Sequence, residues 1–347
     1  MAPDLPPAAL RLDIDRAALT ANWRRLDALS GAARAGAAVK ADAYGLGARV
    51  VVPALREAGC ADFFVTYAGE AADILDLADP VTISLLHGPL TARDADFARQ
   101  TGVRPVINSV TQARRWLDAG GGACDVMVDT GINRLGLTMA MLADEAVRRL
   151  DVEVLLSHLA SADEASPLNA LQLARWQEAR RLLPHRRASL ANSAGITLGA
   201  DYHGDLTRPG LALYGGTPCA ALAGQMRQVA RPAAAIMQVR QLSAGDSVGY
   251  NATFTASAPM RGGVVALGYA DGYLRSWSGR GEMLHAARRL PVLGRVSMDM
   301  VVIDLGPAPD LDEGDWVEVA YCLPEAAALS GLSQYELITL LADRFAR

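Results

Sequence analysis

The sequence is poorest in lysine. Among its 33 basic side chains only Lys40 is a lysine, and the other 32 are arginines. A genome rich in G and C replaces lysine with arginine wherever only positive charge is needed, so the bias itself has a simple explanation. A lysine that remains under such a bias is informative, because its amine can lose a proton and form a Schiff base, whereas arginine stays protonated. Lys40 is therefore the first candidate for a chemical role.

Cysteine is also scarce. Cys60, Cys124, Cys219 and Cys322 lie far apart and form no CxxC pair, which argues against a disulfide framework or a zinc site. We expect no metal, and a reducing cytoplasm is the natural compartment. No apolar run reaches the roughly 20 residues that a membrane helix needs. Residues 1–7 lack the basic and apolar regions of a secretory signal.

The overall composition is that of a soluble globular protein. About half of the residues are apolar and a fifth are charged. The formal net charge of −5 gives no reason to expect nucleic acid or an anionic membrane as a partner. A length of 347 residues favours two domains, or one barrel of about 250 residues with a smaller partner domain.

In the first two-thirds of the chain, short apolar runs alternate with longer amphipathic stretches, which is typical of parallel strands joined by crossover helices. The expected strands are residues 37–39, 63–66, 82–86, 104–107, 125–128, 154–157, 189–191 and 211–214. The expected helices are residues 17–29, 51–58, 110–118, 141–150 and 168–183. About eight strand–helix units favour a closed (β/α)8 barrel of the TIM type over an open sheet.

The pattern changes near Arg231, where short strands separated by Gly and Pro predict a mainly-β domain. Its expected strands are residues 234–242, 246–250, 263–267, 282–284, 290–293, 300–304 and 316–320. Residues 332–347 are expected to close the chain as a helix or an extended tail. We therefore predict an α/β plus β protein, with an N-terminal barrel over residues 1–230 and a C-terminal β domain over residues 231–347.

Lys40 follows the first expected barrel strand, and barrel enzymes carry their active residues at the C-terminal ends of strands. Residues 38–47 (AVKADAYGLG) closely resemble the pyridoxal-phosphate attachment motif of alanine racemases. Seven further motifs of that family follow in its order: residues 129–136 (DTGINRLG), 157–163 (SHLASAD), 191–195 (ANSAG), 208–215 (RPGLALYG), 248–253 (VGYNAT), 268–272 (GYADG) and 294–299 (GRVSMD). One such motif could arise by chance, but eight in order hardly could.

The resemblance implies a fold, an assembly and an activity. It implies a barrel and a β domain paired head to tail in a homodimer, so that each active site uses the barrel of one chain and the β domain of the other. The implied cofactor is pyridoxal 5′-phosphate, and the implied reaction is the interconversion of L-alanine and D-alanine. D-alanine is a peptidoglycan precursor, but the motifs do not separate wall synthesis from alanine catabolism.

Two catalytic bases are implied by the resemblance. Lys40 would bind the cofactor aldehyde and act on one face of the substrate α-carbon, and the partner subunit's Tyr250 would act on the other. Racemisation needs such a pair, because one group removes the proton and another returns it from the opposite side. A tyrosine has a solution pKa near 10, so Tyr250 needs cationic or hydrogen-bonding neighbours.

His158 and Arg208 match two residues that support this chemistry. His158 corresponds to the residue that contacts both the catalytic tyrosine and an arginine under the cofactor. Arg208 corresponds to that arginine, which faces the pyridine nitrogen. Since arginine offers only hydrogen-bond donors, it disfavours protonation of that nitrogen and weakens the ring as an electron sink. This favours rapid return of the proton over transamination.

The remaining roles concern the phosphate and the substrate. By resemblance, the phosphate would be bound by Tyr44, Ser193 and backbone amides near Gly210 and Leu211, and barrels commonly form phosphate sites in their late loops. The implied cofactor-binding set is Lys40, Tyr44, Arg134, Ser193, Arg208, Gly210, Leu211 and Tyr214.

The substrate would meet residues from both domains. Arg134 would contact the cofactor phenolic oxygen or the substrate carboxylate. Met298 and Asp299 match a loop of the partner subunit that receives the carboxylate, and Tyr269 and Arg275 match residues at the entrance.

Two positions depart from the family pattern. Many members carry a carbamylated lysine two residues before the DTG motif, where this chain has Met127. No second lysine can replace it, so we hypothesise that Arg134 is held by Asn133 or by a bound anion such as chloride. Some relatives place a tyrosine near the phosphate shortly before the chain end, where Asp343 or a neighbour stands here. Tyr44 is then expected to carry more of the phosphate binding.

Three other functions compete with this interpretation. A broad-specificity amino-acid racemase of the same fold would share the motifs, because substrate preference depends on pocket size near Met298. A barrel decarboxylase acting on ornithine or a related diamine should show a glycine-rich phosphate loop and a late catalytic cysteine, and Cys322 lacks a suitable context. A non-enzymatic pyridoxal-phosphate carrier would resemble the barrel alone, without the β domain that carries Tyr250.

Overall fold

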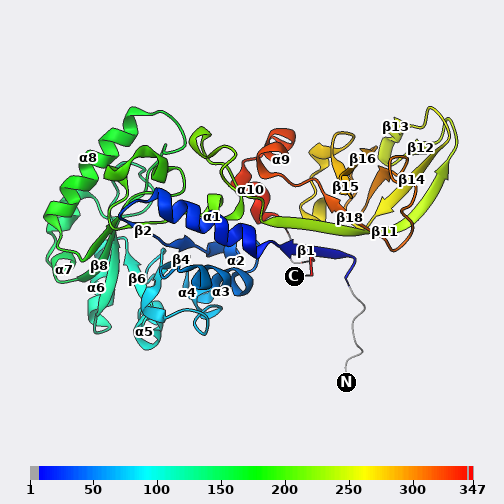
Figure 1. The fold of residues 1–347 in the computed structure, drawn as a ribbon. Helices are drawn as coiled ribbons and strands as arrows, with labels where there is room; N and C mark the ends of the chain where they lie inside the picture. Colours follow the sequence, from blue (N-terminus) through cyan, green and yellow to red (C-terminus); the bar gives the residue numbers. More distant parts are fainter. Residues whose placement is uncertain (1–7, 342–343, 347) are drawn as a thin grey trace, which may run out of the picture. The chain divides into compact units, whose positions relative to one another are not determined.

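The computed structural model describes residues 8–341 and 344–346, which form two compact units (Figure 1). One unit comprises residues 16–227, and the other combines residues 8–15 with residues 228–341 and 344–346. Within the described residues every helix is too short or too polar to cross a membrane. The same residues contain no cluster of three or more His, Cys, Asp or Glu side chains suited to a metal ion.

The unit of residues 16–227 contains a parallel sheet whose strands follow one another in chain order. Its strands are β3 (Ala37–Ala38), β4 (Phe63–Val65), β5 (Ile83–Leu85), β6 (Arg104–Ile107), β7 (Ala123–Met127), β8 (Asp151–Leu156) and β9 (Arg187–Ser189). The short strand β10 (Leu206–Thr207) pairs in parallel with β2 (Arg34–Ala35), which leads into β3.

Backbone hydrogen bonds close this sheet into a barrel. On one side of β10, the N–H of Arg208 donates to Ala191 O at 2.8 Å. On its other side, the N–H of Ala38 donates to Pro209 O at 2.9 Å. With β2 and β3 counted as one strand, the ring has eight, so the predicted (β/α)8 barrel is confirmed.

One helix, α1, precedes the first barrel strand, and the other helices of this unit lie between barrel strands along the chain (Figure 1). Together they are α1 (Arg16–Leu29), α3 (Ala48–Ala58), α4 (Ala68–Ala72), α5 (Ala92–Thr101), α6 (Val110–Asp118), α7 (Glu145–Arg148) and α8 (Pro167–Leu182). Their ends follow local sequence signals. Thr91 and Asp94 form a capping box at the start of α5, and Gly102 ends that helix in the left-handed conformation.

Some expected elements differ from the structure. Residues 211–214 form the 3-10 helix η5 (Leu211–Tyr214) instead of a strand, because a short buried apolar run has no period that separates the two. Residues 141–150 divide into η2 (Met139–Ala143) and α7, because the Asp144 side chain accepts from Ala146 N and starts a new helix. The helices α4 and α5 were not anticipated.

The second unit is built on an antiparallel sheet. The strand order is β1 (Leu10–Ile14), β11 (Ala230–Leu242), β14 (Met260–Val265), β17 (Val301–Asp304), β16 (Arg288–Leu293), β15 (Glu282–His285) and β18 (Trp316–Val319). A further pairing between β11 and β18 joins the sheet back on itself. A small hairpin of β12 (Ser247–Val248) and β13 (Phe254–Thr255) precedes β14, and α9 (Leu323–Ser330) and α10 (Gln334–Thr339) follow β18. The predicted mainly-β C-terminal domain is thus confirmed.

The first strand of the chain belongs to this β unit, whereas we expected residues 1–230 to form the barrel domain. In β1, Leu10 and Leu12 are buried and alternate with Arg11 and Asp13. This alternation suits a strand with one buried face, and β1 pairs antiparallel with β11 along its whole length. The sequence of a five-residue strand does not show whether it pairs within the barrel that follows it or with a strand of the C-terminal β domain.

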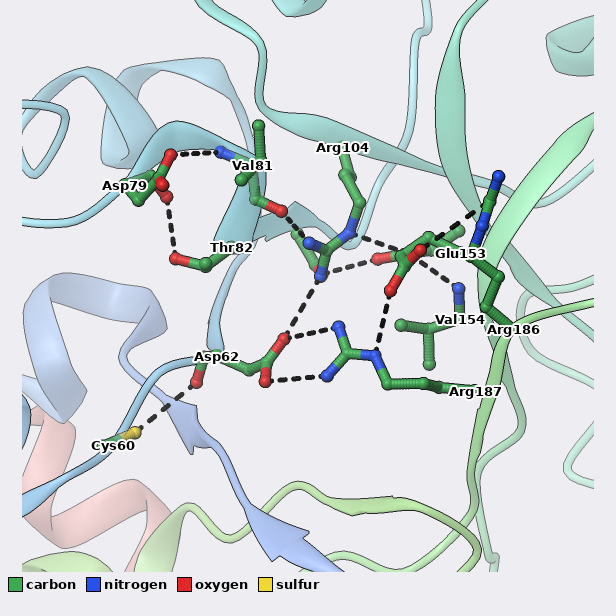
Figure 2. A network of polar contacts seen from close by, with 12 residues as sticks. Cys60, Asp62, Asp79, Val81, Thr82, Arg104, Glu153, Val154, Arg186 and Arg187 are labelled. Carbon is green, nitrogen blue, oxygen red and sulfur yellow. Dashed lines mark hydrogen bonds and ion pairs between the residues drawn. The ribbon is translucent and has the colours of Figure 1, made fainter.

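A network of ion pairs lies where the barrel strands begin (Figure 2). Arg104 and Arg187 are the first residues of β6 and β9, and both pair with Asp62, just before β4. Arg104 Nε also donates to Asp125 Oδ1 at 3.0 Å, and the Asp125 side chain is fully buried. Parallel strands begin at the same end of a barrel, so this network occupies the end opposite Lys40 and concerns stability.

Candidate active site

Lys40 opens the segment α2 (Lys40–Tyr44), which begins two residues after β3. The four residues that follow the lysine have φ between +50° and +58°. This left-handed conformation costs roughly 1–2 kcal/mol per residue for residues with a Cβ. Such a turn persists only where its surroundings hold it, and strained backbone of this kind clusters at functional sites.

Two carboxylates hold this turn. Glu70, on α4, accepts a hydrogen bond from Ala41 N at 2.8 Å and another from Thr66 N at 2.6 Å. Asp42 accepts from Ala48 N at 2.6 Å, at the start of α3. Sequence reasoning missed Glu70, although its place just after the end of β4, at the same end of the barrel as Lys40, could have indicated it.

Positive charge surrounds the Lys40 amine. Partial burial lowers the pKa of Lys40, the cations Arg134 and Arg208 lower it further, and the carboxylate of Glu70 opposes them. Two arginines and one carboxylate thus act on the Lys40 amine, so cations outnumber carboxylates around it. A site of this composition suits an anionic ligand.

Arg208 is buried and its guanidinium contacts only uncharged acceptors among its recorded hydrogen bonds. Nη1 donates to Ser189 Oγ at 2.5 Å, and Nη2 donates to Ser157 O at 2.5 Å. The guanidinium also lies 5.9 Å from the ring centre of Phe64. Burial lowers the pKa of Arg208 to about 10, so the side chain remains a cation at neutral pH.

His158 lies two residues after the end of β8 and is held in a neutral state. Burial, followed by the charges of Arg208, Arg134 and Lys40, lowers the pKa of His158 to about 3. Gln172, on α8, donates to His158 O at 2.9 Å and to Thr130 Oγ1 at 3.1 Å. Sequence reasoning missed Gln172 as well; its signal is a polar residue at helical spacing from the buried Trp176 and Ala179.

Ser193 and the backbone near Gly210 form the candidate phosphate cradle. The fully buried Ser193 Oγ accepts from Gly210 N at 2.9 Å and from Ala212 N at 3.3 Å. With both lone pairs used, its hydrogen can be donated only to a third group. A Cβ on Gly210 would lie 2.3 Å from Tyr44 Oη. Only glycine therefore lets the Tyr44 hydroxyl approach this backbone.

Tyr214 packs beneath this cradle. Its hydroxyl donates to Ala38 O at 2.8 Å, and its ring centre lies 4.9 Å from that of Tyr44. Burial raises the pKa of Tyr214 well above its usual value, so this tyrosine stays protonated. Tyr214 thus supports the strand that precedes Lys40 and the ring of Tyr44. Leu211 is buried in η5, and phosphate binding by its backbone amide stays a prediction.

Arg134 lies in the exposed loop after β7. Asp129 Oδ1 accepts from Gly131 N at 2.8 Å and from Asn133 N at 3.2 Å, which folds the loop back on itself. Asn133 adopts a φ of +53°. Met127 is buried at the end of β7. Asp343, the position expected to lack the phosphate tyrosine, lies outside the described residues.

The other sequence-predicted residues lie in the β unit. Tyr250 begins η7 (Tyr250–Ala252) and is 64% exposed, Tyr269 begins η8 (Tyr269–Asp271) and is 40% exposed, and Met298 is 53% exposed. Asp299 follows Met298, and Arg275 begins η9 (Arg275–Trp277).

Comparison with known proteins assigns the family. A model described as alanine racemase, N-terminal domain, matches residues 14–218, and one described as alanine racemase, C-terminal domain, matches residues 229–347. The chain belongs to the alanine racemase family. Both matches together span the barrel and the β unit, so the resemblance seen in the eight motifs extends over nearly the whole chain.

Individual alanine racemases are similar over their full length. The alanine racemase of Methylobacterium nodulans is 40% identical, covering 97% of this chain and 95% of the relative. The catabolic alanine racemase of Agrobacterium fabrum is 39% identical, covering 98% and 92%. The crystal structure of alanine racemase from Bartonella henselae, described with covalently bound pyridoxal phosphate, is 34% identical with a TM-score of 0.87, covering 98% of this chain and 99% of that chain. Alanine racemases depend on pyridoxal phosphate, which is therefore the cofactor of this chain.

Proposed function

We propose that this protein interconverts L-alanine and D-alanine with pyridoxal phosphate, using Lys40 and the partner subunit's Tyr250 as opposing bases. The observation that carries the proposal is the setting of Lys40. It is the only lysine, it follows a barrel strand on a strained turn, and Arg134 and Arg208 act on its amine.

The residues present fit the cofactor. Ser193 can donate its hydrogen to a phosphate oxygen, and Gly210 leaves room for the Tyr44 hydroxyl. The cations of the site balance a phosphate dianion. When bound, pyridoxal phosphate supplies an electron-withdrawing ring conjugated to the substrate amine, which acidifies the α-hydrogen. Lys40 would hold it covalently, and Arg134 would lie near its phenolic oxygen or the substrate carboxylate.

Proton transfer is the task of the two bases. The lowered pKa of Lys40 increases the unprotonated fraction of its amine, which a base needs near neutral pH. Neutral His158 has an acceptor nitrogen available for the hydroxyl of the partner subunit's Tyr250. Arg208 carries only hydrogen-bond donors; facing the pyridine nitrogen, as the family resemblance implies, it would disfavour protonation of that nitrogen. The weaker electron sink favours return of the proton over transamination.

A homodimer with shared sites accounts for the exposed residues of the β unit. Tyr250, Tyr269 and Met298 are large side chains that remain exposed, and we propose that they enter the partner's site together with Asp299.

Near Arg134 we propose a bound chloride, since Met127 offers no charge where many relatives have a carbamylated lysine. The free cysteines Cys60, Cys124, Cys219 and Cys322 support a cytoplasmic location.

Mixing two inactive variants tests the proposal. Lys40→Ala and Tyr250→Phe each remove one base, and each homodimer should fail to racemise alanine. In a mixed dimer with shared sites, one of the two sites contains an intact Lys40 and an intact Tyr250. If subunits exchange at random, half of the dimers are mixed, and activity should return to about one quarter of the wild-type value.

Each result has a clear meaning. Mixed samples without recovery, although mass spectrometry shows mixed dimers, would refute shared sites. In D2O, Tyr250→Phe loaded with cofactor should exchange the α-hydrogen of one alanine enantiomer without inverting it, which NMR detects. A Tyr250→Phe protein that still racemises at the wild-type rate would refute the two-base assignment. Chloride is tested by anomalous scattering from crystals grown with bromide; absence of a peak beside Arg134 refutes it.

A further inference from the structure

Two loops of the β unit carry the candidate substrate residues and are bonded to each other. Tyr269 N donates to Ser297 O at 3.1 Å, and Ala270 N donates to Met298 O at 3.0 Å. The two loops can approach this closely because residue 268 is a glycine, since a Cβ at that position would lie 2.1 Å from Met298 O. The position of Met298 and Asp299 therefore depends on the loop that begins at Gly268.

Arg344 spans both loops with one guanidinium. Its Nη1 donates to Asp299 Oδ1 at 2.7 Å, and its Nε lies 3.3 Å from Asp271 Oδ1. Asp271 is 1% exposed, and its other oxygen accepts from Gly268 N at 2.8 Å. A single arginine thus joins the carboxylate that shapes the Gly268 loop to the carboxylate beside Met298.

The backbone around Arg344 is itself anchored. Phe345 is buried, Leu12 N donates to Ala346 O at 2.8 Å, and Ala346 N donates to Leu10 O at 3.0 Å. Arg344 therefore reaches the loops from a segment that is fixed on β1. The pair with Asp299 is about half exposed on both sides, and such pairs contribute little to stability. The Arg344–Asp299 pair therefore matters for where it holds the Asp299 side chain and contributes little to the free energy of unfolding.

We propose that Arg344 is a positioning residue for substrate, which sets the placement of Met298 and Asp299 by clamping Asp271 and Asp299 together. The inference rests on the proposed role of Met298 and Asp299 at the substrate carboxylate. Without the guanidinium, Asp271 loses its cationic partner and the two loops are joined by backbone contacts alone. The substrate then meets a loop that samples several positions.

The test compares three variants of the holoenzyme. Arg344→Ala removes the clamp, and Arg344→Lys retains the charge but lacks the planar fork that reaches two carboxylates at once. Arg288→Ala is the matched control, because Arg288 also pairs with an aspartate of the same unit, and its recorded partners are Asp310 and His285 instead of Asp271 or Asp299. The readouts are KM and kcat for D-alanine, the dissociation constant of propionate by calorimetry, and the cofactor absorbance band.

For Arg344→Ala we expect KM and the propionate dissociation constant to rise between about tenfold and a hundredfold, which corresponds to about 1.4–2.8 kcal/mol of lost binding at the displaced loop. The kcat value should change less than about threefold, since the side-chain partners recorded for Arg344 are Asp271 and Asp299 and include neither Lys40 nor Tyr250. Arg344→Lys should fall between Arg344→Ala and wild type, and Arg288→Ala should match wild type.

Two outcomes of the variant comparison overturn the inference. One is an Arg344→Ala enzyme with wild-type KM and wild-type propionate binding; the other is an equal change in Arg288→Ala, which would indicate general destabilisation. A rise in ionic strength should increase KM more in wild type and in Arg288→Ala than in Arg344→Ala, because screening also weakens the exposed Arg344–Asp299 pair where it is present. Equal salt dependence in all three also refutes it. If wild-type enzyme does not racemise alanine at all, the proposed function fails instead.

Discussion

Replacing Glu70 with Gln isolates the interaction that holds the turn at Lys40. The two carboxylate oxygens of Glu70 accept from Ala41 N at 2.8 Å and from Thr66 N at 2.6 Å. A glutamine retains one acceptor oxygen and presents an NH2 group where the other oxygen stood. One backbone N–H then faces a donor, and a hydrogen bond to a charged group contributes about 1.5–3 kcal/mol.

We therefore expect Glu70→Gln to lower the free energy of unfolding by about 1.5–3 kcal/mol. The left-handed turn adds to this effect, because four residues with positive φ persist only while their surroundings hold them. Urea denaturation of the cofactor-free protein, followed by circular dichroism, measures the change. Glu178→Gln, at an exposed position on α8, is the matched control and should stay within about 0.5 kcal/mol of wild type.

Glu70→Gln should also change the pKa of the Lys40 amine. The Glu70 charge raises the pKa of Lys40, so its removal should lower that pKa further. Lys40 is the only ε-amine, and its reaction with trinitrobenzenesulfonate across pH therefore reports this one group, with Lys40→Ala supplying the background. Glu70→Gln should react at lower pH than wild type. An unchanged pH profile together with unchanged stability would refute the role assigned to Glu70.

Three further predictions concern the barrel unit. The pKa of His158 is 6.5 in the unfolded chain and falls to about 3 in the folded state. Between these two pH values the folded state therefore binds fewer protons than the unfolded state. Wild type should lose stability by up to about 1.4 kcal/mol per pH unit as pH falls from about 6.5; urea unfolding from pH 4 to 8 should show a shallower loss in His158→Gln, and equal slopes would contradict the shift. Arg104→Met leaves the fully buried Asp125 without its cation and should cost about 3–5 kcal/mol; activity per folded molecule should not change, and a specific loss of activity would show that the network reaches the site. Ser193→Ala removes the acceptor of two backbone N–H groups and should weaken pyridoxal-phosphate binding about tenfold or more, at about 1–3 kcal/mol per lost contact; a fluorescence titration with wild-type affinity would exclude Ser193 from the cradle.

Sequence periodicity was sufficient to predict the barrel but not to locate the last strand, β10, which closes it. Apolar runs such as residues 63–66 and 104–107 correspond to β4 and β6, because buried parallel strands have near-continuous apolar sequences. The last strand could not be found this way. β10 has only two residues, while the longer run at residues 211–214 is the buried 3-10 helix η5. An apolar run indicates burial, and burial alone does not choose between strand and helix.

The candidate site divides in a similar way. Residues whose chemistry is unusual, such as Lys40 and Arg208, stand within recognisable motifs. Glu70 and Gln172 act by accepting and donating backbone hydrogen bonds, which any of several polar residues could do, so sequence alone gives them no distinctive signal. Arg344 is one arginine among 32, and its contact with Asp271 and Asp299 depends on the tertiary fold.

The charges around Lys40 connect cofactor binding to folding. Arg134, Arg208 and Lys40 repel one another, which is visible in the lowered pKa values of Lys40 and His158. Glu70 offsets them only in part, and Met127 contributes no charge of its own. An anion that binds among these cations relieves their repulsion in the folded state and has no such partner in the unfolded chain. By linkage, it stabilises the fold in proportion to the logarithm of its concentration over its dissociation constant. The same charges that prepare Lys40 for chemistry therefore make the folded state more stable when an anion binds among them.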